Sequence, residues 1–163
     1  MTTPANGYQL TRPPVAKTAM LIRKPVAEVF EAFVDPAITS RFWFTKGSGR
    51  LEPGAHVRWD WEMYGASAEV DVKEIERDRR IVIEWSGGEP TTVEWQFTPL
   101  ADDATFVSIT NAGFRGDGDA IVEQAIGSTE GFTFLLAGLK AFLEHNISLN
   151  LTADRHPKGL AAG

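Results

Sequence analysis

Successive stretches between residues 54 and 111 place an apolar side chain at every second position, and this alternation most constrains how the chain can fold. Such a pattern predicts β-strands with one buried face and one exposed face. A further apolar segment, residues 129–149, has the spacing of an amphipathic helix. One long helix and one sheet with a single apolar face can bury these surfaces against each other. The sequence therefore predicts a sheet that curls around the helix, with room for a cavity between them.

The predicted helix has an apolar stripe with a period of about 3.6 residues. About 20 residues at about 1.5 Å per residue span about 30 Å, which is enough to cross a sheet. A separate helix is expected at residues 119–126, followed by a break at Gly127, with Ser128 as the N-cap of the long helix. Gly131 and Gly138 are unfavourable inside a helix, so we interpret them as points of close approach to the sheet. The stripe consists of Phe132, Leu135, Leu136, Leu139, Phe142 and Leu143.

The first two strands of the alternating region are expected to form a hairpin with Tyr64-Gly65 as a two-residue turn. Met63 would then lie opposite Ala66. Apolar residues would face apolar residues on one side of the hairpin, whereas on the other side Arg58 would meet Asp71 and Asp60 would meet Glu69. The apolar pairs of this register are Trp61–Ala68, Trp59–Val70 and Val57–Val72.

The remaining elements fit a single domain at residues 15–149, between a flexible arm (1–14) and a C-terminal tail (150–163). A strand at 15–22 precedes a helix that starts at Pro25 and presents Val26, Val29, Phe30 and Phe33 on one face. Asp35-Pro36 starts a short second helix, predicted for 36–43. Further strands are expected at 80–85, 91–98 and 105–110.

Composition excludes several classes of function. The formal net charge of −6 argues against nucleic acid or an anionic membrane surface as the partner. The chain has no cysteine, which excludes disulfides, zinc–thiolate sites, iron–sulfur clusters and thiol nucleophiles. The N-terminal residues are polar and proline-rich where a secretion signal would be apolar, so we expect a cytoplasmic protein. We expect no cofactor and no metal, because His56, His145 and His156 are not spaced as metal ligands.

The candidate ligand site is the space between the predicted sheet and the long helix. Burial of an aromatic side chain stabilises a fold by about 1.5–3 kcal/mol, so core packing alone could explain the aromatic residues. A buried indole N–H also needs an acceptor, however, and a cavity that holds water or a ligand would supply one. The predicted cavity residues are Trp43, Trp59, Trp61, Trp85, Trp95, Phe97, Phe132, Leu135, Leu136 and Leu139.

The residues themselves indicate no catalytic centre. No serine lies in a G-x-S-x-G nucleophile elbow. Asp60, Glu62, Glu69 and Asp71 would cluster in the predicted hairpin, and paired carboxylates can perform acid–base chemistry. Because they alternate with tryptophans, we expect them on the outer, solvated face of the sheet.

Several segments resemble a known family. They are residues 22–33 (IRKPVAEVFEAF), Asp35-Pro36 followed by Arg41-Phe42-Trp43, residues 107–114 (VSITNAGF) and residues 131–144. Over residues 15–147 the chain resembles the family named for the activator of the heat shock protein 90 ATPase, in the START and birch-pollen-allergen (SRPBCC) superfamily. The resemblance implies an α+β helix-grip fold: a curved antiparallel sheet around a long C-terminal helix, with two short helices after the first strand.

The resemblance also implies a function class. Bacterial members are taken to bind small, fairly apolar ligands in the cavity, and the family shares no catalytic triad. We therefore predict binding of a small, largely apolar molecule between the sheet and the C-terminal helix. Two alternatives stay open: a co-chaperone-like module that stimulates a chaperone ATPase, and a cavity enzyme of the cyclase or hydrolase kind. The eukaryotic namesake engages its chaperone with an additional N-terminal domain, for which this chain has no room.

Overall fold

A computed structural model describes residues 8–86 and 88–160 of the chain. The strands are β1 (Ala16–Ile22), β2 (Lys46–Gly47), β3 (His56–Trp61), β4 (Ala66–Glu76), β5 (Arg80–Ser86), β6 (Thr91–Ala101) and β7 (Ala104–Ala112). The helices are α1 (Val26–Val34), α2 (Pro36–Thr39), α3 (Gly118–His145) and α4 (Leu151–Arg155), with a 3₁₀ turn, η1, at Glu62–Tyr64. Residues 1–7 of the predicted arm, residues 161–163 of the predicted tail and Gly87 of a predicted turn lie outside the described residues.

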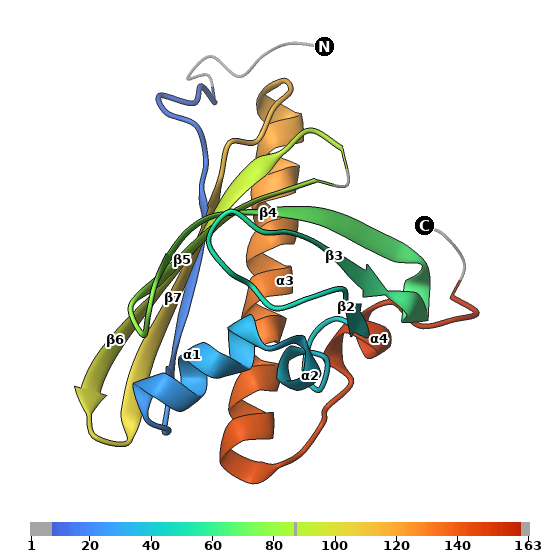
Figure 1. Ribbon diagram of the computed structural model, residues 1–163. Coiled ribbons are helices and arrows are strands. Elements are labelled where there is room, and N and C mark those ends of the chain that lie inside the picture. The colour runs from blue at the N-terminus through green and yellow to red at the C-terminus, as the bar shows by residue number, and fades with distance from the viewer. Residues whose placement is uncertain (1–7, 87, 161–163) are drawn as a thin grey trace.

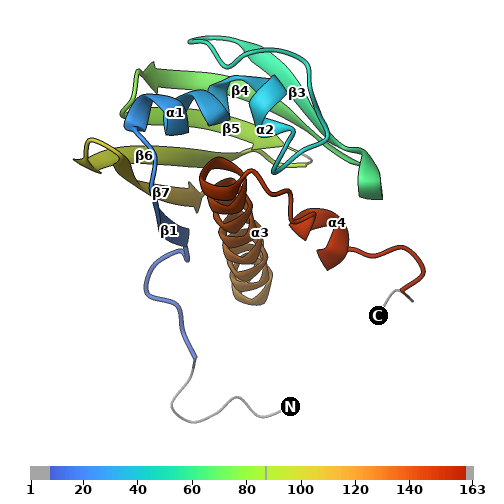
Figure 2. The same cartoon turned by 90° about the horizontal axis from the view of Figure 1, so that it is seen from below.

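The strands form one antiparallel sheet in the order β1-β7-β6-β5-β4-β3-β2. The sheet curves around α3, which crosses its concave side, as Figures 1 and 2 show. The helices α1 and α2 lie at one end of the sheet, and α4 lies beside α3 below the β3–β4 hairpin. This arrangement is the α+β helix-grip fold that the sequence predicts.

The short helix α2 ends earlier than predicted, at Thr39 instead of residue 43. Asp35 caps its start, since the carboxylate accepts a hydrogen bond from the backbone N–H of Ala37 at 3.0 Å. Trp43 and Phe44, which follow, are both buried. After Thr39 the backbone N–H groups of Arg41 and Phe42 bond carbonyl oxygens three residues earlier, at 2.9 Å and 3.2 Å, so the chain continues as turns and not as an α-helix.

The predicted register of the β3–β4 hairpin is wrong by two residues. Trp61 pairs with Ala66, Trp59 with Ala68 and Val57 with Val70. The turn is longer than predicted because η1 separates the strands, and Gly65 closes it with a φ of 71°. A type I′ turn at Tyr64-Gly65 would have required a positive φ at both residues. A shift by an even number of residues keeps every side chain on its predicted face, so the tryptophans still point inward.

Helix α3 is continuous over 28 residues, so the predicted break at Gly127 and the N-cap role of Ser128 are wrong. The N-cap is Asp117, whose carboxylate accepts from the backbone N–H of Ala120 at 2.8 Å. The helix ends at His145, before the predicted residue 149, because Asn146 adopts the left-handed conformation of a C-cap. The apolar stripe is buried against the sheet at Phe132, Leu135, Leu136 and Leu139.

Helix α3 packs closely against its neighbours at Gly138 but not at Gly131. A Cβ atom added to Gly138 would lie 3.0 Å from the carbonyl oxygen of Phe42, so this glycine does mark a close approach, but to the segment after α2 and not to the sheet as predicted. At Gly131 an added Cβ would meet nothing within 4 Å, so the same interpretation is wrong there. The helix is therefore tightly packed near its C-terminal end and leaves open space near Gly131.

These two glycines yield a matched test of the packing. Gly131→Ala should raise the free energy of unfolding by up to about 1 kcal/mol, because alanine favours the helix and meets no neighbour. Gly138→Ala should lower it by about 1 kcal/mol, because contact with a backbone oxygen outweighs the same gain in helix propensity. Urea unfolding of both variants measures the difference. An equal gain in the two variants would contradict the close approach at Gly138.

Candidate functional site

A pocket of about 550 Å³ opens between the concave face of the sheet and α3. Its apolar walls come from the segment after α2, from β3 to β5, and from α3. The apolar lining residues are Trp43, Trp61, Ala66, Ala68, Trp85, Phe132 and Phe134. The pocket also extends along α3, where Gly127 and Gly131 line it.

The structure divides the predicted cavity residues into two groups. Trp43, Trp61, Trp85 and Phe132 line the pocket. The other six do not line the pocket and are buried in the core, where Phe97, for example, packs against Phe30 of α1 with ring centroids 5.4 Å apart. An alternating pattern shows which face a side chain occupies but not how far along the sheet the core is filled. The six core residues are Trp59, Trp95, Phe97, Leu135, Leu136 and Leu139.

One end of the pocket carries a polar cluster centred on Asn111, which is only 2% exposed. The Asn111 amide nitrogen donates to Thr91 Oγ1 and to the carbonyl oxygen of Thr92, both at 2.9 Å. The Asn111 amide oxygen accepts from the hydroxyl of Ser128 at 2.7 Å. The indole N–H of Trp85 also donates to Thr91 Oγ1, at 3.1 Å. We call Thr91, Asn111 and Ser128, which all line the pocket, the polar pole.

The indole nitrogens differ in how they are satisfied. Trp85 donates to the protein hydroxyl of Thr91, so it needs neither water nor ligand. The buried indole nitrogen of Trp95 has no hydrogen-bond partner among the described residues. A buried donor without a partner costs about 1–3 kcal/mol, which offsets part of the stabilisation gained by burying the Trp95 ring.

Helix α4 and the tip of the β3–β4 hairpin form the mouth of the pocket. Arg155 of α4 donates to Glu130 of α3 at 2.6 Å. The His156 ring, just after α4, lies 4.9 Å from the ring of Tyr64 in η1. All four residues line the pocket. Partial burial raises the pKa of the Tyr64 hydroxyl, so this group remains a neutral phenol at physiological pH.

Neither the polar pole nor the mouth of the pocket was among the features predicted from the sequence. The polar pole could have been predicted from the alternating pattern, because Asn111 lies on the same inward face of β7 as Val107 and Ile109. Thr91 likewise continues the inward phase of β6, and Ser128 lies four residues before Phe132 on the same helical face. A polar residue on an apolar face is the informative observation. By contrast, α4 is a single turn and a half with no periodic signal long enough to predict it.

The family model described as Activator of Hsp90 ATPase homolog 1-like protein matches residues 23–144. The chain belongs to this family. The match to the Activator of Hsp90 ATPase homolog 1-like family runs from the residue after β1 to the last turn of α3, so β1 and α4 lie outside the matched residues. A search of curated proteins found no match.

Solved structures of similar fold include the protein SSP2350 from Staphylococcus saprophyticus. It is 30% identical, with a TM-score of 0.71 over 83% of this chain and 95% of its own. DynU16, a protein in the dynemicin biosynthetic locus, is 21% identical, with a TM-score of 0.72 over 83% of this chain and 49% of its own. The di-domain ARO/CYC BexL of the BE-7585A biosynthetic pathway is 16% identical, with a TM-score of 0.71 over 80% of this chain and 46% of its own. The last two likenesses concern the fold alone.

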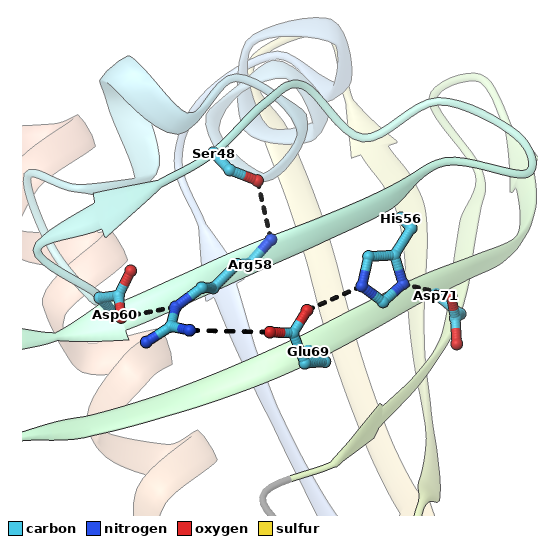
Figure 3. Close-up of polar contacts among 6 residues, drawn as sticks. All are labelled: Ser48, His56, Arg58, Asp60, Glu69 and Asp71. Atoms are coloured by element: carbon cyan, nitrogen blue, oxygen red, sulfur yellow. Dashed lines mark hydrogen bonds and ion pairs between the residues drawn. The ribbon is translucent and has the colours of Figure 1, made fainter.

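Asp60, Glu69 and Asp71 lie together on one face of the β3–β4 hairpin, as Figure 3 shows, and none of them lines the pocket. His56 lies between two of them: Nδ1 is 2.7 Å from Asp71 and Nε2 is 2.7 Å from Glu69. Arg58 donates to Asp60 at 3.0 Å and lies 3.8 Å from Glu69. All five side chains are at least partly exposed, so the cluster is a solvated ion-pair network and not a second cavity.

Residues 8–86 and 88–160 contain no group of His, Cys, Asp or Glu side chains placed to hold a metal ion. Within the same residues, no helix has both the length and the apolar character needed to cross a membrane.

The outer cluster predicts a pH dependence. Hydrogen bonds to Asp71 and then Glu69 raise the pKa of His56, because only the imidazolium can donate from both nitrogens. The stabilisation from His56 is therefore complete below its ordinary pKa of about 6.5 and disappears as the pH rises through the folded-state value. The bond to His56 lowers the pKa of Asp71, whose contribution is lost as the pH falls through its own folded-state value.

An NMR titration of the His56 ring protons measures this effect. Asp71→Asn should lower the His56 pKa, because it removes the carboxylate with the largest influence. Asp60→Asn is the matched control, since Asp60 bonds Arg58 and does not contact His56. An equal shift in the two variants would show that the general field of the acidic face, and not the hydrogen bond, sets the pKa.

Proposed function

We propose that this protein binds a small, largely apolar molecule in the pocket between the sheet and α3. The observation that carries the proposal is the pocket itself: aromatic walls from Trp43, Trp61, Trp85 and Phe132, with hydrogen-bonding groups gathered at one end. Pockets for small molecules are typically about 300–1,000 Å³, mostly apolar, with a few polar groups that fix orientation. The family membership and the biosynthetic-pathway proteins of similar fold support the same interpretation.

A cavity enzyme is the second candidate, because titratable side chains line the mouth of the pocket. Glu130, Arg155, Tyr64 and His156 are all present there. However, Glu130 and Arg155 are bonded to each other, and the Tyr64 and His156 rings lie against each other. Binding without chemistry therefore fits the geometry better. A co-chaperone role rests on the family description alone, and stimulation of a chaperone ATPase by the purified protein would test it.

A variant that fills the pocket tests the proposal. Gly131 lines the pocket, and a side chain added there meets open space, so Gly131→Phe should occupy the binding volume without disturbing the fold. We expect native mass spectrometry of the purified wild-type protein to detect a copurified small molecule, and Gly131→Phe to lose it. Gly131→Ala is the matched control and should retain it, because one methyl group leaves most of the pocket open.

Isothermal titration calorimetry with naphthalene complements the mass measurement, since it does not depend on a copurified molecule. Binding to the wild-type protein and to Gly131→Ala, with at least a tenfold loss in Gly131→Phe, is the expected result. The proposal fails if wild-type protein neither carries a small molecule nor binds the added one.

A further inference from the structure

The hydrogen atoms of the polar pole have only one consistent arrangement. The carbonyl oxygen of Thr92 can only accept, so the Asn111 atom that contacts it must be the amide nitrogen, which fixes the orientation of the side chain. The same nitrogen then donates its second hydrogen to Thr91 Oγ1. The indole nitrogen of Trp85 can only donate, and it also bonds Thr91 Oγ1. Thr91 Oγ1 therefore accepts twice.

This arrangement leaves the Thr91 hydroxyl hydrogen unused. A threonine hydroxyl has two acceptor lone pairs and one hydrogen. Both lone pairs are engaged, by Asn111 and by Trp85. Across residues 8–86 and 88–160, no acceptor is bonded to the Thr91 hydrogen. Because Thr91 lines the pocket, its hydrogen is an available donor for a ligand.

Ser128 has the opposite character. The amide oxygen of Asn111 can only accept, so Ser128 must donate its single hydroxyl hydrogen in their 2.7 Å bond. Its lone pairs receive no hydrogen bond from any described residue, and Ser128 also lines the pocket. The pole thus presents a donor at Thr91 and an acceptor at Ser128, bonded to the two ends of one amide group.

The pole carries no charge that would favour an ionised ligand. The cation on the pocket wall, Arg155, is already bonded to Glu130, and the carboxylate of Glu89 is paired with Arg115. A ligand carboxylate would find no unpaired guanidinium among these groups, because each arginine is already bonded to a glutamate. An ammonium group could use Ser128 as an acceptor but would leave the Thr91 donor unsatisfied.

We propose that the ligand presents a neutral hydroxyl group, as an alcohol or a phenol, to the polar pole. Its oxygen accepts from Thr91 and its hydrogen is donated to Ser128, while its apolar body lies against Trp61, Trp85 and Phe132. A ketone or an ether would satisfy Thr91 alone. This inference rests on the proposed binding function and adds to it the chemical class of the ligand.

Four probes of one skeleton test the inference by isothermal titration calorimetry at neutral pH: naphthalene, 2-naphthol, 2-methoxynaphthalene and 2-naphthoate. We expect 2-naphthol to bind about fivefold tighter than 2-methoxynaphthalene, which retains the acceptor and lacks the hydrogen. We expect 2-naphthoate to bind more weakly than 2-naphthol, because it is an anion without a counterion. In ¹H–¹⁵N spectra, 2-naphthol should shift the Trp85 indole and Asn111 side-chain signals.

The variant Ser128→Ala tests whether the polar pole causes the preference for 2-naphthol. Alanine is compatible with the helical position of Ser128. The preference for 2-naphthol over 2-methoxynaphthalene should fall to near one, because the acceptor is lost and the Asn111 oxygen is buried. Ser108→Ala removes a hydroxyl from the outer face of β7 and should keep the wild-type ratio.

The outcomes separate the two proposals. Equal binding of 2-naphthol and 2-methoxynaphthalene to the wild-type protein overturns the hydroxyl inference and leaves the pocket as a binding site. A preference that survives in Ser128→Ala also overturns it, because the hydroxyl is then recognised elsewhere. Absence of binding by all four probes overturns the hydroxyl inference, and it overturns the binding function as well if no small molecule copurifies with the wild-type protein.

Discussion

Helix α3 packs closely against its neighbours at one end and not at the other. The rest of the structure depends on this difference. A Cβ atom added to Gly138 would lie 3.0 Å from the Phe42 carbonyl oxygen, and the Phe42 ring packs against Phe33 of α1 with ring centroids 5.8 Å apart. A Cβ atom added to Gly131 would have no neighbouring atom within 4 Å. A straight helix against a curved sheet therefore packs at one end and leaves a pocket at the other. The position of the pocket is a consequence of where the core can close.

Asn111 connects the three elements that border the open end. Its amide joins β7 to β6 through Thr91 and Thr92, and to α3 through Ser128. Burying an amide is costly unless its hydrogen bonds are made, and here both amide hydrogens and the oxygen have partners. The network therefore fixes the orientation of the pole before any ligand arrives, which limits the entropy lost on binding.

Much of this fold could be predicted from the sequence. The spacing of apolar residues along an element, and the face on which each side chain lies, depend on neighbouring residues in the chain. The alternation of Trp59 and Trp61 with charged residues placed the tryptophans inside and the acidic residues outside, and the structure confirms both. The register of the hairpin could not be predicted in the same way. Registers that differ by two residues bury the same side chains, so the choice between them depends on the turn at η1.

The candidate site was less accessible to prediction, for two physical reasons. Core and pocket residues share one pattern, so Trp95 and Trp85 look alike in sequence although only Trp85 lines the pocket. The continuity of α3 through Gly127 depends on tertiary packing that outweighs the local helix propensity of glycine. Ser128 was interpreted as a helix cap because its hydroxyl has a local use, whereas in the fold that hydroxyl bonds a residue 17 positions away.

The direction of the hydrogen bonds at the pole can be traced to a single backbone group. The Thr92 carbonyl belongs to β6, and its oxygen has no hydrogen to give, whatever the ligand. It orients the Asn111 amide, which turns Thr91 into a donor toward the pocket and Ser128 into an acceptor. A side chain alone could rotate or flip to suit several ligands, but a backbone carbonyl in a sheet cannot. The preference of the pole for one arrangement of donor and acceptor is therefore a property of the fold itself.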